Sequence, residues 1–137
     1  MIYTVKIGWR ACAYDNILNE EDADFYLFGE RAVLLYIGVA YLQDVKKEID
    51  ANINDFSLNR YGIDIWLGNI TESDYVKITE QIVKDVECLL IITNQPKLNT
   101  QCKKNYFGRD NLKVISSGRA LLIPCVRVEN NHIYDYC

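Results

Sequence analysis

The sequence has no long apolar run, and none of its hydrophobic stretches approaches the ~20 residues that a membrane-spanning helix needs. Proline occurs only twice, and no repeat, low-complexity tract or Gly/Ser-rich linker divides the 137 residues. We therefore expect one domain over residues 1–137, long enough to bury a hydrophobic core, with no membrane as a partner. The first residues also lack the basic and then apolar layout of a secretory signal, so we expect a cytoplasmic protein.

Cysteine is present, but not in the spacing of paired sites. The five cysteines are an odd number, and no two of them form a CxxC motif. We therefore expect neither a disulfide framework nor a cysteine-rich zinc site, and we interpret the thiols as reduced and mostly buried. The single histidine, His132, lies in a polar segment and is expected at the surface. The sequence has no evident Ser/His/Asp set and no glycine-rich phosphate loop.

The net charge is −4 and the isoelectric point is near 5.0. Proteins that contact many phosphates are usually basic, so this charge argues against strong non-specific DNA binding. A local basic patch with aromatic residues remains one interpretation of the region after residue 96, and an ordinary solvated loop is the other. The patch would consist of Lys97, Lys103, Lys104, Arg109 and Lys113, with Tyr106 and Phe107 among them.

Hydrophobic periodicity predicts an α+β fold, in which a small mixed or antiparallel β-sheet carries helices on one face. The predicted helices are about 42–55 and about 73–93, the second capped by Thr71 or Ser73 and ended by Pro96. The predicted strands are 1–13, 25–28, 33–39, 63–67, 112–116 and 120–128. The order is an N-terminal strand, a β-β-α-β-α core and a C-terminal hairpin that turns at 117–119.

Three residues in these elements have side chains suited to chemistry. Glu87 lies beside the apolar face of the second helix, where a carboxylate needs a partner; a divalent cation is one, and a Lys or Arg is another. Tyr26 and Tyr36 lie on the two strands of the predicted hairpin. A tyrosine acts as an acid or base when its surroundings shift its pKa, although a strand tyrosine also packs without any catalytic role.

Taken together, these residues resemble the GIY-YIG nuclease family. Asp24-Phe25-Tyr26 matches the first motif only in its tyrosine, whereas Tyr36-Ile37-Gly38 matches the second motif fully. Glu87 follows on the second helix, and Gln95-Pro96-Lys97-Leu98-Asn99 resembles the segment with the asparagine of the family. The resemblance covers residues 24–100, which leaves 101–137 as a C-terminal extension.

The resemblance implies a metal-dependent endonuclease that hydrolyses nucleic-acid phosphodiester bonds, with DNA as the expected partner. Glu87 would hold Mg²⁺ or Mn²⁺, Tyr26 or Tyr36 would act on the base side, and Asn99 would support the site. The phosphate-binding arginine of the family is expected where this chain has Lys46, which keeps the charge but not the planar fork.

Two other positions also depart from the family pattern. Val39 follows Gly38 where lysine is common, and Asp50 stands where histidine or tyrosine often falls. These departures define the alternative function: a catalytically impaired domain that binds nucleic acid or a protein partner. A structural domain whose tyrosines only pack is the third interpretation.

Overall fold

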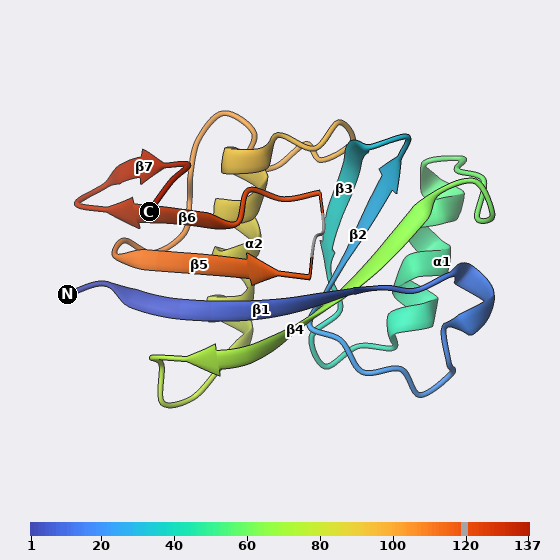
Figure 1. The fold of residues 1–137 in the computed structure, drawn as a ribbon, viewed down its shortest axis with the longest axis horizontal. Helices are drawn as coiled ribbons and strands as arrows, with labels where there is room; N and C mark the ends of the chain where they lie inside the picture. Colours follow the sequence, from blue (N-terminus) through green and yellow to red (C-terminus); the bar gives the residue numbers. More distant parts are fainter. Residues whose placement is uncertain (119–120) are drawn as a thin grey trace.

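The computed structural model describes residues 1–118 and 121–137, which form one mixed sheet, two α-helices and a short 3-10 helix (Figure 1). The strands are β1 (Tyr3–Ala11), β2 (Phe25–Glu30), β3 (Val33–Val39), β4 (Asp64–Ser73), β5 (Leu112–Ser117), β6 (Cys125–Glu129) and β7 (His132–Tyr134). The helices are α1 (Val45–Asp55) and α2 (Glu80–Asn94), and the 3-10 helix is Tyr14–Asn16. The predicted α+β class is confirmed.

The strands of the described residues lie in the order β3-β2-β4-β1-β5-β6-β7. Strand β1 pairs with β4 in antiparallel and with β5 in parallel orientation, which makes the sheet mixed, and the other described pairings are antiparallel. The predicted N-terminal strand is therefore at the centre of the sheet. It joins the β3-β2-β4 part to the β5-β6-β7 part that follows α2.

Several predicted boundaries are wrong. The β4 strand continues to Ser73, because it keeps pairing with β1 up to Val5, and α2 begins only at Glu80. Its cap is Thr79, whose side chain accepts a hydrogen bond from the backbone of Ile82. Strand β6 begins after Pro124, and β7 is an additional strand. Positions 119 and 120, where we predicted the end of the turn and the start of a strand, lie outside the described residues.

The two helices pack on opposite faces of the β2–β3 hairpin, which corrects the prediction that both lie on one face. Tyr26 and Phe28 of β2 pack with the buried residues of α1, whereas Phe25 and Leu27 pack with those of α2. Figure 1 shows the hairpin running between α2 on the left and α1 on the right. The physical reason is the two-residue period of a strand: the unbroken apolar run of β2 supplies a buried side chain to each face.

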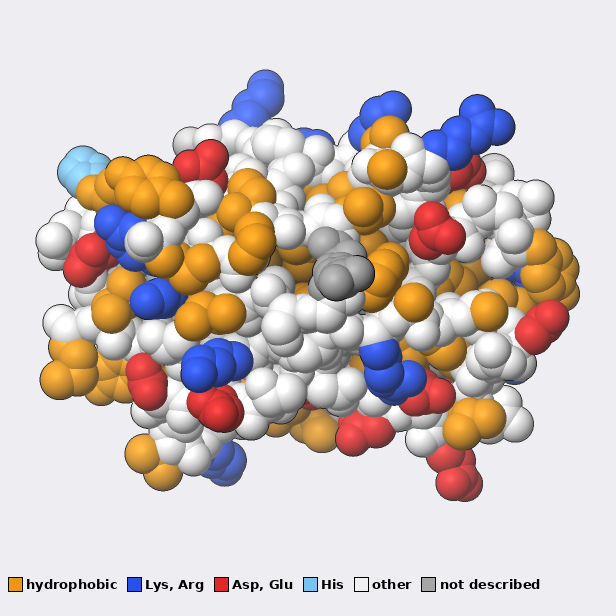
Figure 2. Space-filling model, viewed as in Figure 1, with side chains coloured by type: hydrophobic (Ala, Val, Ile, Leu, Met, Phe, Trp, Pro, Cys, Tyr) orange, Lys and Arg blue, Asp and Glu red, His pale blue; other side chains and the backbone are white. Residues whose placement is uncertain are grey.

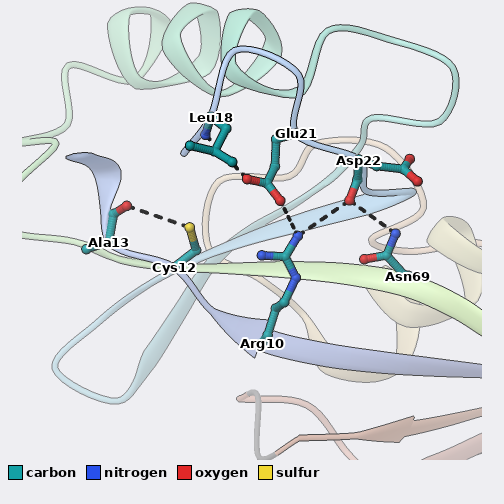
Figure 3. Close-up of polar contacts among 7 residues, drawn as sticks. All are labelled: Arg10, Cys12, Ala13, Leu18, Glu21, Asp22 and Asn69. Atoms are coloured by element: carbon teal, nitrogen blue, oxygen red, sulfur yellow. Dashed lines mark hydrogen bonds and ion pairs between the residues drawn. The ribbon is translucent and has the colours of Figure 1, made fainter. Parts of the chain in front are cut away.

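Arg10 of β1 fixes the segment that leads into β2 (Figure 3). Its guanidinium donates to the carboxylate of Glu21 at 2.5 Å and to the carbonyl oxygen of Asp22 at 3.5 Å. The side-chain amide of Asn69 in β4 donates to the same carbonyl oxygen at 3.2 Å. These contacts hold the acidic loop against the sheet and set where β2 begins.

Four of the five cysteines form disulfides, so the expectation of reduced thiols is wrong for them. Cys88 in α2 is bonded to Cys102 in the loop that follows, and Cys125 in β6 is bonded to Cys137. Cys12 is free and buried. The partners are 14 and 12 residues apart in the sequence, and only the folded chain brings their Cα atoms to 5.4 Å and 5.7 Å. The first bond attaches the loop after α2 to the helix that carries Glu87.

The surface mixes charged and apolar side chains. Figure 2 shows Lys and Arg side chains projecting along the upper border of the molecule, over the loops that follow α2 and join β2 to β3. In the described part of the chain, no helix has the length and apolar character needed to cross a bilayer.

Candidate active site

Tyr26 and Gly38 form a matched pair across the β2–β3 hairpin. The two residues are directly opposite in the strand register, and the Tyr26 ring lies against the Gly38 backbone. A Cβ atom at position 38 would overlap the ring and hydroxyl of Tyr26. The glycine of the Tyr36-Ile37-Gly38 run therefore has a steric function, because it leaves room for the Tyr26 ring.

The Tyr26 hydroxyl lies between α1 and Tyr36. The side-chain amide of Asn52 in α1 donates a hydrogen bond to it, and the Tyr36 side chain is near enough to raise its pKa. Burial, followed by the nearby Tyr36 and Glu48, raises the pKa of Tyr26 far above the usual tyrosine value. The residue is only 1% exposed and stays protonated at neutral pH. It is suited to hold Tyr36 in position rather than to accept a proton.

Tyr36 is on the edge strand β3 and is the more accessible of the two tyrosines. Its ring centroid lies 6.0 Å from that of Tyr26 and 5.0 Å from that of Phe56, the residue that follows α1. Burial and then the charge of Glu87 raise the pKa of Tyr36, while the neighbouring Tyr26 side chain lowers it. Tyr36 lines a cleft of about 310 Å³, which we call the tyrosine cleft. Its lining residues are Tyr36, Phe56, Glu87, Ile91, Leu98, Asn99, Thr100 and Gln101.

Glu87 reaches the tyrosine cleft from α2, on the other face of the hairpin. Burial raises the pKa of its carboxyl to about 7, and the charge of Lys84 acts in the opposite direction. In the described part of the chain, no hydrogen bond or ion pair involves this carboxylate, and Lys84 instead pairs with Glu80 at 3.2 Å. Glu87 is thus a partly buried carboxylate whose oxygens remain open to a ligand. A divalent cation is one of the partners that the sequence suggested for it.

Glu87 also lines a second cleft of about 290 Å³, which we call the helix cleft. Lys84, Cys88 and Phe107 are among its lining residues, and it shares Glu87, Ile91 and Gln101 with the tyrosine cleft. The Glu87 carboxylate therefore lies between the tyrosine cleft and the helix cleft, which share these three lining residues.

Asn99 supports the edge strand that carries Tyr36. Its side-chain oxygen accepts a hydrogen bond from the backbone N–H of Ile37 at 3.0 Å, and its side-chain nitrogen donates to the Ile37 carbonyl at 2.9 Å. Because both ends of the amide are used in this way, Asn99 acts on the site by holding β3 in place. Gly38, which follows Ile37 in β3, packs against the Tyr26 ring.

The structure does not bring Lys46 to the cleft. The Lys46 ammonium lies 5.8 Å from the ring centroid of Tyr14, and the hydroxyl of that tyrosine donates to Asp50 at 2.6 Å. Lys46 and Glu48 are two residues apart on α1, so their side chains point about 200° away from each other. The face of α1 that meets the tyrosines therefore carries Glu48 and Asn52, and Lys46 lies on another face. Four residues of the predicted site come together: Tyr26, Tyr36, Glu87 and Asn99. Lys46 lies apart from them.

The predicted basic patch is partly used in internal contacts. Arg109 donates to the buried carboxylate of Asp85 at 2.6 Å, and the ammonium of Lys103 bonds to the carbonyl oxygen of Pro96. Lys97 and Lys104 are exposed.

A divalent cation at Glu87 would have one carboxylate from the protein. Among the described residues, no group of three or more His, Cys, Asp or Glu side chains could enclose a metal ion. Magnesium is often bound by only one or two carboxylates, with water and substrate phosphate completing the shell. The donor set at Glu87 fits that type of site and does not fit a closed structural metal centre.

The sequence prediction missed Asn52, Glu48 and Lys84. Asn52 bonds to Tyr26, Glu48 raises the pKa of both tyrosines, and Lys84 is the cation whose charge acts on Glu87. A signal for the first two was present in the sequence, since both are polar and lie one turn apart on the same side of α1. Comparisons of the chain with protein-family models, with curated protein sequences and with solved structures found no match.

Proposed function

We propose that this chain is a divalent-metal-dependent phosphodiesterase that cleaves nucleic acid, with a GIY-YIG-type core in residues 24–100. The observation that carries the proposal is the shared cleft of Tyr36 and Glu87, a tyrosine hydroxyl and an unpartnered carboxylate with a pKa of about 7. A metal held by the carboxylate and a water held by the hydroxyl can meet at one phosphate, because the two groups line the same cleft.

The arrangement of the core supports the same proposal. The hairpin β2–β3, helix α1, strand β4 and helix α2 follow one another in the expected order, and β2 lies between β3 and β4. Asn99 comes after α2 and returns to the outer edge of β3. The GIY-YIG resemblance thus rests on the spatial neighbours of Tyr26 and Tyr36 as well as on the motifs.

The chain's own residues have separate functions in this proposal. Glu87 holds Mg²⁺ or Mn²⁺, which when bound stabilises the negative charge that develops on phosphate oxygens. Tyr36, neutral at pH 7, binds the attacking water through its hydroxyl oxygen and orients it. Asn52 holds the Tyr26 hydroxyl by a hydrogen bond, and the Tyr26 ring packs beside that of Tyr36, which keeps Tyr36 in position. Lys84, which lines the helix cleft, exchanges its exposed ion pair with Glu80 for the phosphate and supplies positive charge in place of the family's arginine.

One observation favours a second candidate, the catalytically impaired binding module. The face of α1 that meets the tyrosines carries Glu48, whose charge raises the pKa of both of them, while Lys46 lies beside Tyr14. An acidic group near the phosphate position would oppose binding of the substrate. This candidate keeps the fold and the cleft and assigns them to binding alone.

The test is cleavage of supercoiled plasmid DNA, and of RNA in parallel, with magnesium or manganese. We compare the wild type with Glu87→Gln and with the matched control Glu72→Gln, which changes a carboxylate whose side chain is 70% exposed. The proposal expects cleavage to be lost only in Glu87→Gln. An absence of cleavage in the wild type on all substrates would reject it. If the wild type does not cleave, nucleic-acid binding that is the same in the wild type and in Glu87→Gln would favour the binding module.

A further inference from the structure

The tyrosine cleft and the helix cleft continue into a third hollow. This loop cleft, of about 570 Å³, is lined by Thr100, Gln101, Cys102, Lys103, Lys104, Asn105 and Phe107. It shares Gln101, Cys102 and Phe107 with the helix cleft, which in turn shares Glu87 with the tyrosine cleft. The three hollows are therefore neighbours along a path from Tyr36, past Glu87, to Phe107 and Lys104, which we call the groove.

Phe107 stands exposed on a backbone that is firmly held. The residue is 77% exposed, while its backbone N–H donates to the sulfur of Cys88 at 3.4 Å. Before Phe107 in the chain, the disulfide between Cys102 and Cys88 attaches the loop to α2. Across Phe107, the Tyr106 hydroxyl donates to the carbonyl oxygen of Arg109 at 2.6 Å. An aromatic ring displayed to solvent from a fixed backbone is pre-organised for a planar ligand, because little freedom is lost on binding.

The segment that forms the loop cleft is locally basic in an acidic chain. Residues 95–109 contain four Lys or Arg and no Asp or Glu, whereas the net charge of the chain is −4. Lys104 is exposed at the loop cleft, and Lys84 lines the helix cleft. Asp85, which also lines the helix cleft, is compensated by its ion pair with Arg109. Lys104 thus offers positive charge beside Phe107, and Lys84 offers it on the other side when it exchanges its exposed ion pair with Glu80 for a phosphate.

We propose that this groove binds a single strand of nucleic acid, with one base stacked on Phe107 and with phosphates beside Lys104 and Lys84. A strand in this path leads its backbone toward Glu87. The strand is single because a base paired in a duplex does not present its face to an aromatic side chain, whereas an unpaired base does. This inference rests on the proposed function insofar as the bound strand is the substrate that the Tyr36–Glu87 site cleaves.

The experiment measures the fluorescence anisotropy of labelled oligonucleotides in EDTA at low salt, with the Glu87→Gln protein, so that no cleavage interferes. The probes are single-stranded DNA, single-stranded RNA and the blunt DNA duplex of the same length. We expect at least one single strand to bind about ten-fold more tightly than the duplex. Tighter binding of the duplex than of both single strands would overturn the inference.

Phe107→Ala, added to this protein, should weaken single-strand binding about ten-fold, which is the size of one lost base stack, and Phe107→Trp should restore it. Tyr61→Ala is the matched control, since Tyr61 is 71% exposed and lies outside the groove. Lys104→Gln should weaken binding of all strands and reduce the salt dependence by about one phosphate contact. Equal affinities for Phe107→Ala and Tyr61→Ala would overturn the inference.

The result also separates this inference from the proposed function. Binding that depends on Phe107, together with no cleavage by the wild-type protein in magnesium or manganese, would support the groove and reject the nuclease. Cleavage that depends on Glu87 but not on Phe107 would support the nuclease and reject the groove. Because the Phe107 side chain is largely exposed, its replacement leaves the core intact, and a thermal unfolding curve for each variant verifies this.

Discussion

Asn99 closes the outer edge of strand β3 through two hydrogen bonds to the backbone of Ile37, at 3.0 Å and 2.9 Å. Its amide thereby takes the place of a neighbouring strand. Asn99→Asp sets a carboxylate against the Ile37 carbonyl, so we expect the free energy of unfolding to fall by about 1–3 kcal/mol in urea denaturation. Asn105→Asp changes an exposed residue and should have little effect. Similar losses in both variants would contradict a specific bond to β3.

Gly38→Ala should destabilise the protein, because the added methyl group would overlap the Tyr26 ring. We expect a loss of about 1–3 kcal/mol in the free energy of unfolding, as for other overpacked core positions. Gly62→Ala is the matched control, since the atoms nearest to its methyl group would belong to the Asn59 side chain, at 3.0 Å and beyond. If denaturation curves show that Gly38→Ala is no less stable than Gly62→Ala, the steric role assigned to Gly38 is refuted.

Glu87→Gln should stabilise the metal-free protein at alkaline pH. Burial raises the pKa of Glu87 to about 7 from 4.5, so the folded chain keeps its proton while the unfolded chain loses it. Wild-type stability therefore falls as pH rises from about 4.5 to about 7 and stays lowered above that range. We expect the variant to exceed the wild type by about 2–3 kcal/mol at pH 8 and to show no such gain at pH 4.

Urea denaturation in EDTA at both pH values measures this difference. The control Glu72→Gln removes an exposed carboxylate and should show the same stability relative to the wild type at pH 4 and pH 8. A gain for Glu87→Gln that does not depend on pH would mean that its carboxyl group titrates normally.

Tyr36→Phe should lower the rate of cleavage by roughly 100-fold, because the hydroxyl that orients the attacking water is lost. Tyr26→Phe should have a smaller effect on the rate, because Tyr26 is buried and acts through Tyr36. Lys46→Met should leave the rate unchanged, since the Lys46 ammonium lies beside Tyr14. Initial rates of plasmid nicking measure all three. A loss of activity in Lys46→Met would contradict the placement of the site.

Cys12 should be the one thiol of the native protein. Alkylation of the unfolded protein without reductant should label Cys12 alone, and alkylation after reduction should label all five cysteines. Cys102→Ser, which opens the bond to Cys88, should lower the free energy of unfolding by about 3 kcal/mol for a loop of this length. Labelling of all five cysteines without reductant would contradict both bonds. Disulfides are rare in cytosolic proteins, so the two bonds disagree with the expectation of a cytoplasmic protein.

Local patterns predicted the elements that depend on neighbouring residues. The period of the apolar residues indicated α1 and β3, and the proline at position 96 indicated the end of α2, which closes at Asn94 with Gln95 in the left-handed conformation. The start of α2 was misplaced, because Thr71, Ser73 and Thr79 all have side chains that can cap a helix. Pairing of β4 with β1 excludes the first two as caps, and that pairing joins segments far apart in the sequence.

For the candidate site, the sequence by itself determined which groups are available: two tyrosines on a hairpin, a glutamate on a helix and an asparagine after it. Only the tertiary structure decided which of them meet. It places Glu87 and Tyr36 at one cleft although their elements face opposite sides of the hairpin, and it directs Lys46 toward Tyr14. The reason is that burial, charge and steric fit depend on neighbours from distant segments, as the pKa of Glu87 and the contact of Gly38 with Tyr26 show.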